Sequence, residues 1–119
     1  MGASGRIVVT AGQIGWNPLT GEIETDEIAA QTRQALMNVV AVLRAGDAEP
    51  SHVVRMTWFI TDRKAYVDAR RKIGRIYKEI FGEHYPAMTV VVVTGLLEDR
   101  AMVEIEATAV VPHTRSLRL

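Results

Sequence analysis

The sequence predicts one α+β domain, residues 1–119, in which two helices pack on one face of a mixed β-sheet. Apolar residues alternate or run continuously in the segments 6–14, 53–60, 88–93 and 101–111, which is typical of strands. In two other stretches they recur at helical spacing. The resulting order is strand, helix, strand, helix, strand, strand, and it favours helices gathered on one side of a sheet.

The first strand is predicted at residues 6–14, which are rich in Ile and Val and lead into a turn-rich loop. After this loop, Thr25 or Asp26 is available as the N-cap of a helix. Gly46 follows the basic last turn of that helix, as expected at a helix end. The side chains that share its apolar face are Ile28, Thr32, Ala35, Leu36, Val39, Val40 and Leu43.

The second half of the chain repeats this succession and then adds two strands. Residues 53–60 form a strand that is largely apolar on both faces, and Asp62 can cap a second helix that Gly82 ends. Residues 88–93 are also apolar on both faces, which predicts a strand covered on both sides. Residues 101–111 form the last strand. The buried stripe of the second helix is predicted to hold Tyr66, Ala69, Ile73, Ile76, Tyr77 and Ile80.

Strands that are apolar on both sides need cover on the second face of the sheet as well. Two helices can shield only one face of such a small domain. We therefore expect the other face to be buried against copies of the same chain. The pattern indicates an oligomer, but it does not give the number of copies.

The composition excludes several classes of protein. Fourteen basic residues balance fourteen acidic ones, so no strong field attracts nucleic acid, and we expect no nucleic-acid partner. The chain has no cysteine, and no apolar run approaches the ~18 residues of a membrane span. We expect a cytoplasmic protein without a membrane partner. His52, His84 and His113 lack the spacing of metal ligands, so we expect neither a metal nor another cofactor.

The last strand carries a pair of carboxylates. Residues two apart on a strand share a face, so Met102, Glu104, Glu106 and Thr108 should point the same way, with the two carboxylates ~7 Å apart. Burial would raise the pKa of such a carboxyl group toward the range useful for general acid or base catalysis. In the alternative interpretation, one or both glutamates form ion pairs with arginines. Candidates for these partners are Arg6, Arg33 and Arg55.

Two segments resemble the RidA family, which is also called YjgF or L-PSP. They are AGQIGWNPLTGEI at residues 11–23 and YPAMTVVVVTGLLEDRAMVEIEATAVV at residues 85–111. The resemblance implies a chorismate-mutase-like fold and a homotrimer that binds a small metabolite in clefts between its subunits. It also implies the hydrolysis of reactive enamines or imines, the reaction of the best-known members of the family.

The resemblance gives two positions a role in that chemistry. Glu104 matches the glutamate that positions the hydrolytic water in RidA-like enzymes. Met88 stands where deaminating members have the arginine that holds the substrate carboxylate, and a thioether offers no such charge. Met88 can instead fill the core or line a more apolar pocket. We therefore expect a substrate whose binding relies less on a carboxylate group than the binding of 2-aminoacrylate does.

Other candidate binding residues lie in the two motif segments. The loop containing Gly12 and Gln13 matches the family's Gly-Gln-Ile signature, and its backbone amides can bind a ligand oxygen, although such glycines often serve turns alone. Trp16 can line the rim of a cleft or cover a subunit contact. His84 and Tyr85 lie in the loop that leads to Met88, at the expected edge of the cleft.

Three functions remain for comparison. The first is a RidA-like enamine or imine deaminase with Glu104 as the water-activating residue. The second is a non-catalytic trimer that binds a ligand or another protein. The third, an endoribonuclease or translation inhibitor, gains little support from the neutral charge. The basic residues of the second helix are interpreted as a solvated face, and these are Arg70, Arg71, Lys72, Arg75 and Lys78.

Overall fold

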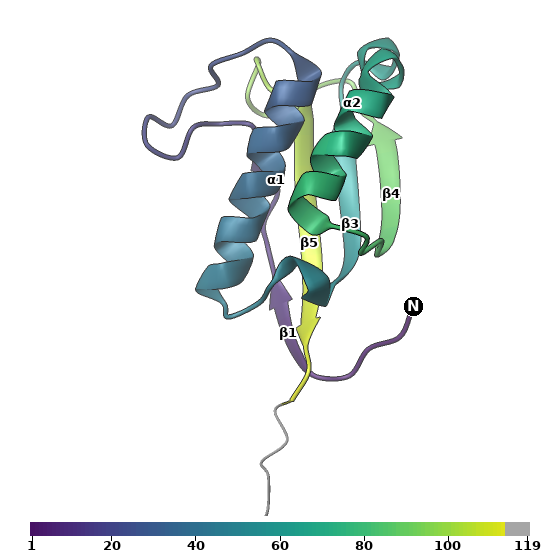
Figure 1. Cartoon of the computed structure of the whole chain (residues 1–119). Coiled ribbons are helices and arrows are strands. Elements are labelled where there is room, and N and C mark those ends of the chain that lie inside the picture. The colour runs from purple at the N-terminus through teal and green to yellow at the C-terminus, as the bar shows by residue number, and fades with distance from the viewer. Residues whose placement is uncertain (114–119) are drawn as a thin grey trace, which may run out of the picture.

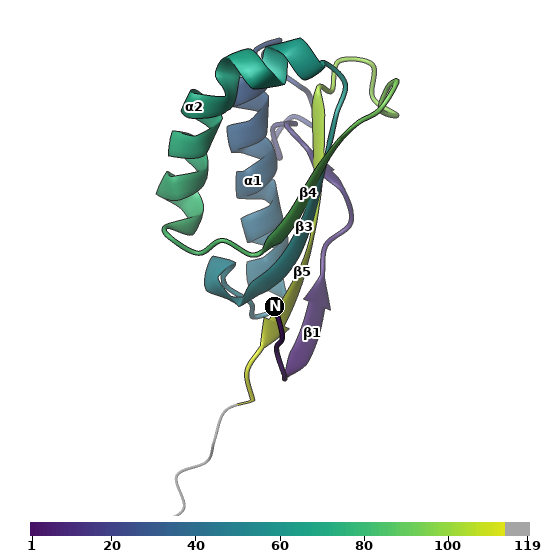
Figure 2. The same ribbon diagram turned by 90° about the vertical axis from the view of Figure 1, so that its right-hand side faces the viewer.

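The computed structural model describes residues 1–113, and it consists of a sheet with two helices on one of its faces. Helices α1 (Ile28–Ala45) and α2 (Arg63–Phe81) lie side by side, and Figure 2 shows both on the same side of the sheet. A short 3-10 helix, Pro50–His52, precedes the third strand. The predicted α+β class and the single helical layer are therefore confirmed. The strands are β1 (Arg6–Val9), β2 (Gln13–Ile14), β3 (Val53–Ile60), β4 (Ala87–Val92) and β5 (Val103–Val111).

The sheet is mixed and has the order β1-β5-β3-β4, with β2 as a further partner of β5. Strand β5 is antiparallel to β1, β2 and β3, whereas β4 runs parallel to β3. The predicted strand at 6–14 is therefore two strands. The interruption falls at Thr10, whose side-chain hydroxyl, in place of a backbone carbonyl, accepts a hydrogen bond of 3.0 Å from the Ala107 N–H of β5.

The predicted start and end of the second helix are right, and so is the predicted end of the first helix at Gly46, but the predicted start of the first helix is wrong. Asp62 Oδ1 accepts a hydrogen bond of 2.9 Å from the Ala65 N–H at the start of α2, and Gly82 ends that helix with a φ of 64°. Helix α1, however, has Glu27 at its N-cap position without a side-chain cap, so neither Thr25 nor Asp26 caps it. The Asp26 carboxylate forms an ion pair of 3.0 Å with Arg100 instead.

The core lies between the helices and the sheet. All seven predicted side chains of the α1 face are buried, and Leu36 and Leu43 are among the most completely enclosed. On α2, Ile73, Ile76 and Tyr77 are buried as predicted. The other predicted residues of that stripe, Tyr66, Ala69 and Ile80, pack against the core but stay partly exposed.

The face of the sheet away from the helices is open in the described chain. On β3 this face carries Arg55, Thr57 and Phe59, so the prediction that both faces of this strand are apolar is wrong. The prediction that β4 is covered on both sides is also wrong within one chain. Strand β4 is an edge strand with no described neighbour beyond it, and Met88 and Val92 are 40% and 54% exposed.

One buried polar side chain fixes the start of β5. Gln31 on α1 is fully buried, and its Nε2 donates hydrogen bonds to the carbonyls of Thr25 (2.8 Å) and Arg100 (3.0 Å). Its Oε1 accepts a hydrogen bond of 2.8 Å from the Met102 N–H. This side chain therefore joins α1, the loop that precedes it and the segment that enters β5.

We predict that Gln31→Met lowers the free energy of unfolding by about 2–4 kcal/mol, because a side chain of similar size leaves two carbonyls and one N–H without partners. Urea unfolding should show a lower midpoint with an unchanged m-value. The control is Gln34→Met on the same helix, since Gln34 is half-buried and its side-chain donor contacts only Asn38. Equal losses from both variants would contradict the role given to Gln31.

Candidate functional site

Glu104 lies near the start of β5, on the open face of the sheet. It stands opposite Ile14 of β2 and Phe59 of β3, and its side chain is partly buried. A Cβ atom at Gly12 would lie 2.7 Å from Glu104 Cδ and 2.8 Å from its Oε2. The absence of a side chain at Gly12 therefore lets the carboxyl group of Glu104 lie directly against the backbone of the Gly12 loop.

The predicted sharing of a face by the two glutamates is confirmed by the strand register. Glu104 is opposite Phe59, Glu106 is opposite Thr57, and the next residue on this face, Thr108, is opposite Arg55. Met102 precedes β5, in a bend outside the strand. Sequence alternation alone was sufficient to place both carboxylates outside the core.

Among residues 1–113, neither Glu104 nor Glu106 forms an ion pair. Two of the arginines considered as partners are engaged elsewhere. Arg6 donates a hydrogen bond of 2.8 Å to the Gly46 carbonyl, and Arg33 pairs with Glu79 at 2.8 Å. Arg55 shares a hollow of about 230 Å³ with Glu106 on the open face, without an ion pair between them.

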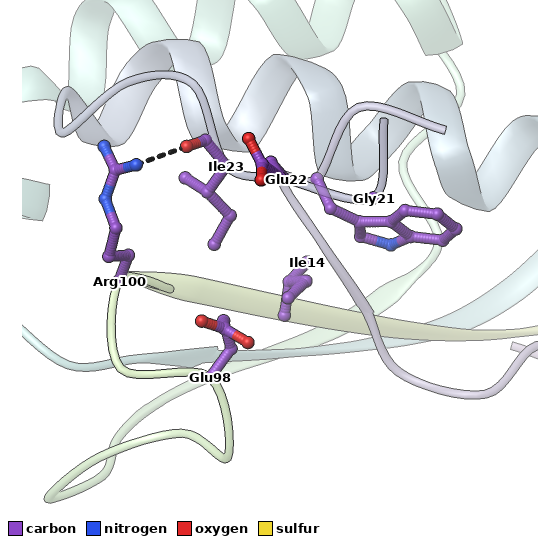
Figure 3. A pocket seen from close by; sticks show the side chains of 7 residues that line it. Ile14, Gly21, Glu22, Ile23, Glu98 and Arg100 are labelled. Atoms are coloured by element: carbon purple, nitrogen blue, oxygen red, sulfur yellow. Dashed lines mark hydrogen bonds between the residues drawn. The ribbon is translucent and has the colours of Figure 1, made fainter. Parts of the chain in front are cut away.

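A larger hollow of about 560 Å³ adjoins Ile14, the cross-strand neighbour of Glu104. Figure 3 shows that it lies between the loop of Gly21–Ile23 and the loop that carries Glu98 and Arg100. Trp16 also lines this hollow. The hollow is thus bounded by Glu22 and Ile23 from one loop and by Glu98 and Arg100 from the other.

Arg100 is a residue of this hollow that the sequence did not single out. Its Nη1 donates a hydrogen bond of 2.5 Å to the Ile23 carbonyl, and its Nη2 lies 3.0 Å from Asp26 Oδ1. These contacts join the loop before β5 to the loop before α1. A single arginine in a polar loop carries no sequence signal of such a contact, because its partners lie more than seventy residues away in the chain.

Gln13 and Gly12 differ in what they contact. The side chain of Gln13 bonds locally, with Nε2 3.3 Å from the Ala11 carbonyl, and its backbone pairs opposite Ile105. Gly12 instead touches the carboxyl group of Glu104. Of the two predicted loop residues, Gly12 is the one that the structure brings against Glu104.

Met88 lies on the opposite face of the sheet from Glu104. It is aligned with Met56 of the parallel neighbour β3, and alternation puts both on the helix side with Trp58. The two positions that the family resemblance links are therefore not brought together within one chain. Glu104 and Met88 can line the same site only if they come from different copies.

Met88 and Tyr85 instead line a groove of about 280 Å³ between α2 and the edge strand, which we call the α2–β4 groove. It is mainly aromatic and apolar. Residues that line it include Trp58, Tyr66, Ile73, Tyr77, Tyr85 and Met88.

The aromatic side of this groove is held by a chain of contacts that includes Tyr85. Tyr77 stacks on Phe81 and on Tyr85 at ring-centroid distances of 4.9 and 5.7 Å, and its hydroxyl donates a hydrogen bond of 2.6 Å to the His84 carbonyl. Burial, and secondarily Tyr85, raises the pKa of Tyr77 to about 12. A ring nitrogen of His84 lies 2.6 Å from the Val53 carbonyl, so the loop before β4 is tied to the start of β3.

Side chains that could bind a metal ion do not form a cluster in the described part of the chain. Within residues 1–113, no group of three or more His, Cys, Asp or Glu side chains is arranged to hold a metal ion. None of the helices within residues 1–113 combines the length and the apolar composition that a membrane span requires.

Comparisons with known proteins agree on one family. A family model described as Endoribonuclease L-PSP matches residues 2–111. The 2-iminobutanoate/2-iminopropanoate deaminase of Escherichia coli is 38% identical over 109 residues, which is 89% of this chain and 80% of that protein. A RutC family protein from Pyrococcus horikoshii is 38% identical over 106 residues, with the same shares covered.

Solved structures give the same result. The YjgF gene product of E. coli superposes with a TM-score of 0.76 at 37% identity, over 89% of this chain and 81% of that one. E. coli TdcF with bound serine gives a TM-score of 0.75 at 38% identity, over 87% and 80% of the two chains. The family model spans nearly the whole described range, and the relatives match in both sequence and fold, so the chain belongs to the RidA family, also called YjgF or L-PSP.

Proposed function

We propose that this protein is an enamine or imine deaminase in which Glu104 activates the attacking water. The observation that carries the proposal is the position of Glu104, whose carboxyl group lies against Gly12 without an ion-pair partner in residues 1–113. Its cross-strand neighbour Ile14 lines the large hollow. The names of two relatives, 2-iminobutanoate/2-iminopropanoate deaminase and a reactive intermediate deaminase, support this reaction class.

The proposed reaction needs one base and one water molecule. The carboxylate of Glu104 accepts a proton from water as the water oxygen adds to the carbon of a protonated C=N bond, which gives a neutral carbinolamine. Glu104 passes this proton to the amine nitrogen, and it accepts the hydroxyl proton as the C–N bond breaks. Nitrogen leaves as ammonia, and a carbonyl compound remains. The backbone of Gly12 and Gln13 and the indole of Trp16 are proposed to bind the substrate beside this carboxylate.

We propose a substrate whose binding does not require an ionic contact between its carboxylate and the side chain at position 88. Met88 has no charge to offer, and the loss of a desolvated arginine contact is on the order of several kcal/mol. An imine formed during catabolism, with little or no acidic character near the reacting carbon, fits this environment better than 2-aminoacrylate.

We further propose that the active protein is a cytoplasmic homotrimer. Glu104 and Met88 face opposite sides of one sheet, so a cleft that contains both must lie between copies. The open face also exposes Ile7 and Val9, which association would cover. The lack of cysteine fits the reducing cytoplasm.

A non-catalytic ligand-binding or protein-interaction trimer is the main alternative, and exposed Met88, Tyr85 and Leu97 are the features that favour it. An endoribonuclease is disfavoured by the balanced charge of the chain, despite the description of the family model.

We predict that Glu104→Gln lowers turnover of the true substrate by roughly 10²-fold or more, because it removes the base and preserves size. Assembly, measured by sedimentation, should not change. Glu106→Gln is the matched control, since it lies on the same face of the same strand. Wild-type turnover by Glu104→Gln would favour the non-catalytic alternative, and dissociation of this variant would assign Glu104 a structural role.

We predict slow hydrolysis of 2-aminoacrylate by the wild-type protein, because no arginine stands at position 88. In a coupled assay of ammonia release, Met88→Arg should raise activity toward acidic imines and leave uncharged imines unaffected. Met88→Leu controls for the change of shape. Efficient turnover of 2-aminoacrylate by the wild type would show that another cation binds its carboxylate.

We predict a trimer in sedimentation equilibrium at micromolar concentration. Val91→Asp should prevent assembly or cost about 3 kcal/mol or more, since Val91 is on the open face beside Phe59 and association would bury the new charge. Val92→Asp, on the other face of the same strand, is the comparison. A stable wild-type monomer, or an assembled Val91→Asp variant, would contradict the proposed interface.

A further inference from the structure

We propose that Asn38 is a positioning residue for the candidate site at Glu104. Asn38 lies on α1, which covers the face of the sheet opposite to the Glu104 side chain (Figure 2). Its side chain nevertheless holds the backbone of residues 11–16, which we call the Gly12 segment. These contacts do not depend on any activity, whereas their effect on catalysis rests on the function proposed for Glu104.

The side-chain amide of Asn38 donates two hydrogen bonds to this segment. Its Nδ2 donates to the carbonyls of Ile14 (3.0 Å) and Trp16 (2.9 Å). Its Oδ1 accepts a hydrogen bond of 2.9 Å from Gln34 Nε2, so the whole amide is engaged. Asn38 is only 6% exposed, and a variant without an amide donor would leave both carbonyls poorly satisfied.

Gly15 allows the segment to approach α1 closely enough for these bonds. A Cβ atom at Gly15 would lie 2.6 Å from the Gln31 carbonyl oxygen and 2.8 Å from the Gln31 Cα. Both are backbone atoms of a packed helix, which cannot move aside as the end of a side chain can. A side chain at position 15 would therefore push the segment away from Asn38.

The segment has an anchor on each side of Gly12. Before it, Thr10 exchanges two hydrogen bonds with β5. After it, strand β2 consists of Gln13 and Ile14 alone, and a ladder this short forms few hydrogen bonds to β5. The bonds from Asn38 reinforce this second anchor from the helix side. The place of Gly12 is thus set by the sheet at one end and by α1 at the other.

The place of Gly12 in turn limits where the carboxyl group of Glu104 can lie. A Cβ atom at Gly12 would be 2.8 Å from Glu104 Oε2, so the backbone here is packed against the carboxyl group. A misplacement on the order of 1 Å in a catalytic group can cost about 10²-fold in rate. Asn38 should therefore affect turnover, although none of its hydrogen bonds goes to Glu104.

The first test follows the segment itself, by amide hydrogen exchange in the full-length, assembled protein. Asn38→Leu keeps the branched shape of the side chain and removes both donors. Gly15→Ala displaces the segment and leaves Asn38 intact. Each variant should make the β2 amides exchange about 10-fold faster or more, relative to the amides of β3. Wild-type exchange of β2 in both variants would overturn the proposal.

The second test measures hydrolysis of an uncharged imine, formed from benzylamine by a flavin amine oxidase. Asn38→Leu and Gly15→Ala should each lower kcat about 10-fold or more. Asn38→Leu should have little further effect in a Glu104→Gln background, where the base is already absent. A loss caused by weaker folding or weaker substrate binding would appear in both backgrounds. Equal losses in the two backgrounds would thus overturn the link between Asn38 and Glu104.

Gln34→Met is the matched control on the same helix. It removes the partner of Asn38 Oδ1 and leaves both bonds to the carbonyls, so exchange of β2 and kcat should stay close to the wild type. Changes as large as those of Asn38→Leu would overturn the proposal, because repacking of α1 would then explain them. If the wild type does not accelerate imine hydrolysis but Asn38→Leu loosens β2, the proposed function fails and the positioning of the segment by Asn38 stands.

Discussion

The register of β5 is the constraint on which the rest of the molecule depends. This strand pairs with β1, β2 and β3, and its odd-numbered residues, among them Val103 and Ile105, enter the core. Its even-numbered residues, among them Glu104, face away from the helices. A slip of one residue would exchange the two sets and bury carboxylates among apolar side chains. The same pairing that closes the core therefore exposes the candidate base.

The two faces of the sheet also separate Glu104 from Met88, the two positions to which the family resemblance gives a role. The side chains of Glu104 and Met88 point to opposite faces of the sheet, so they cannot meet within one chain. Met88 therefore belongs to a surface that is distinct from the one holding Glu104. In this protein the helix-side surface has an aromatic lining, and the open side keeps the carboxylate beside Gly12.

Local sequence patterns were sufficient to predict both helices, the Asp62 cap and the alternation around Glu104, because each depends on neighbours a few residues apart. Features set by distant contacts were missed. The break after β1 falls at Thr10, whose hydroxyl bonds to Ala107, and the exposure of β4 depends on its place at the edge of the sheet. Arg100 was missed for the same reason, since the pairing of loops far apart in sequence has no periodicity to reveal it.

Because Gly12 lies so close to Glu104, the two possible orders of substitution at these positions have different consequences. A side chain gained at position 12 while Glu104 is present must move the flexible carboxyl group from its place, so that step alters the candidate site at once. If Glu104 is first replaced by a small residue, the space is vacated and position 12 becomes free to vary. Descendants of such a chain could then accumulate bulk at position 12, after which the return of glutamate would be sterically blocked. The loss of this glutamate is thereby a change that neighbouring substitutions can make irreversible.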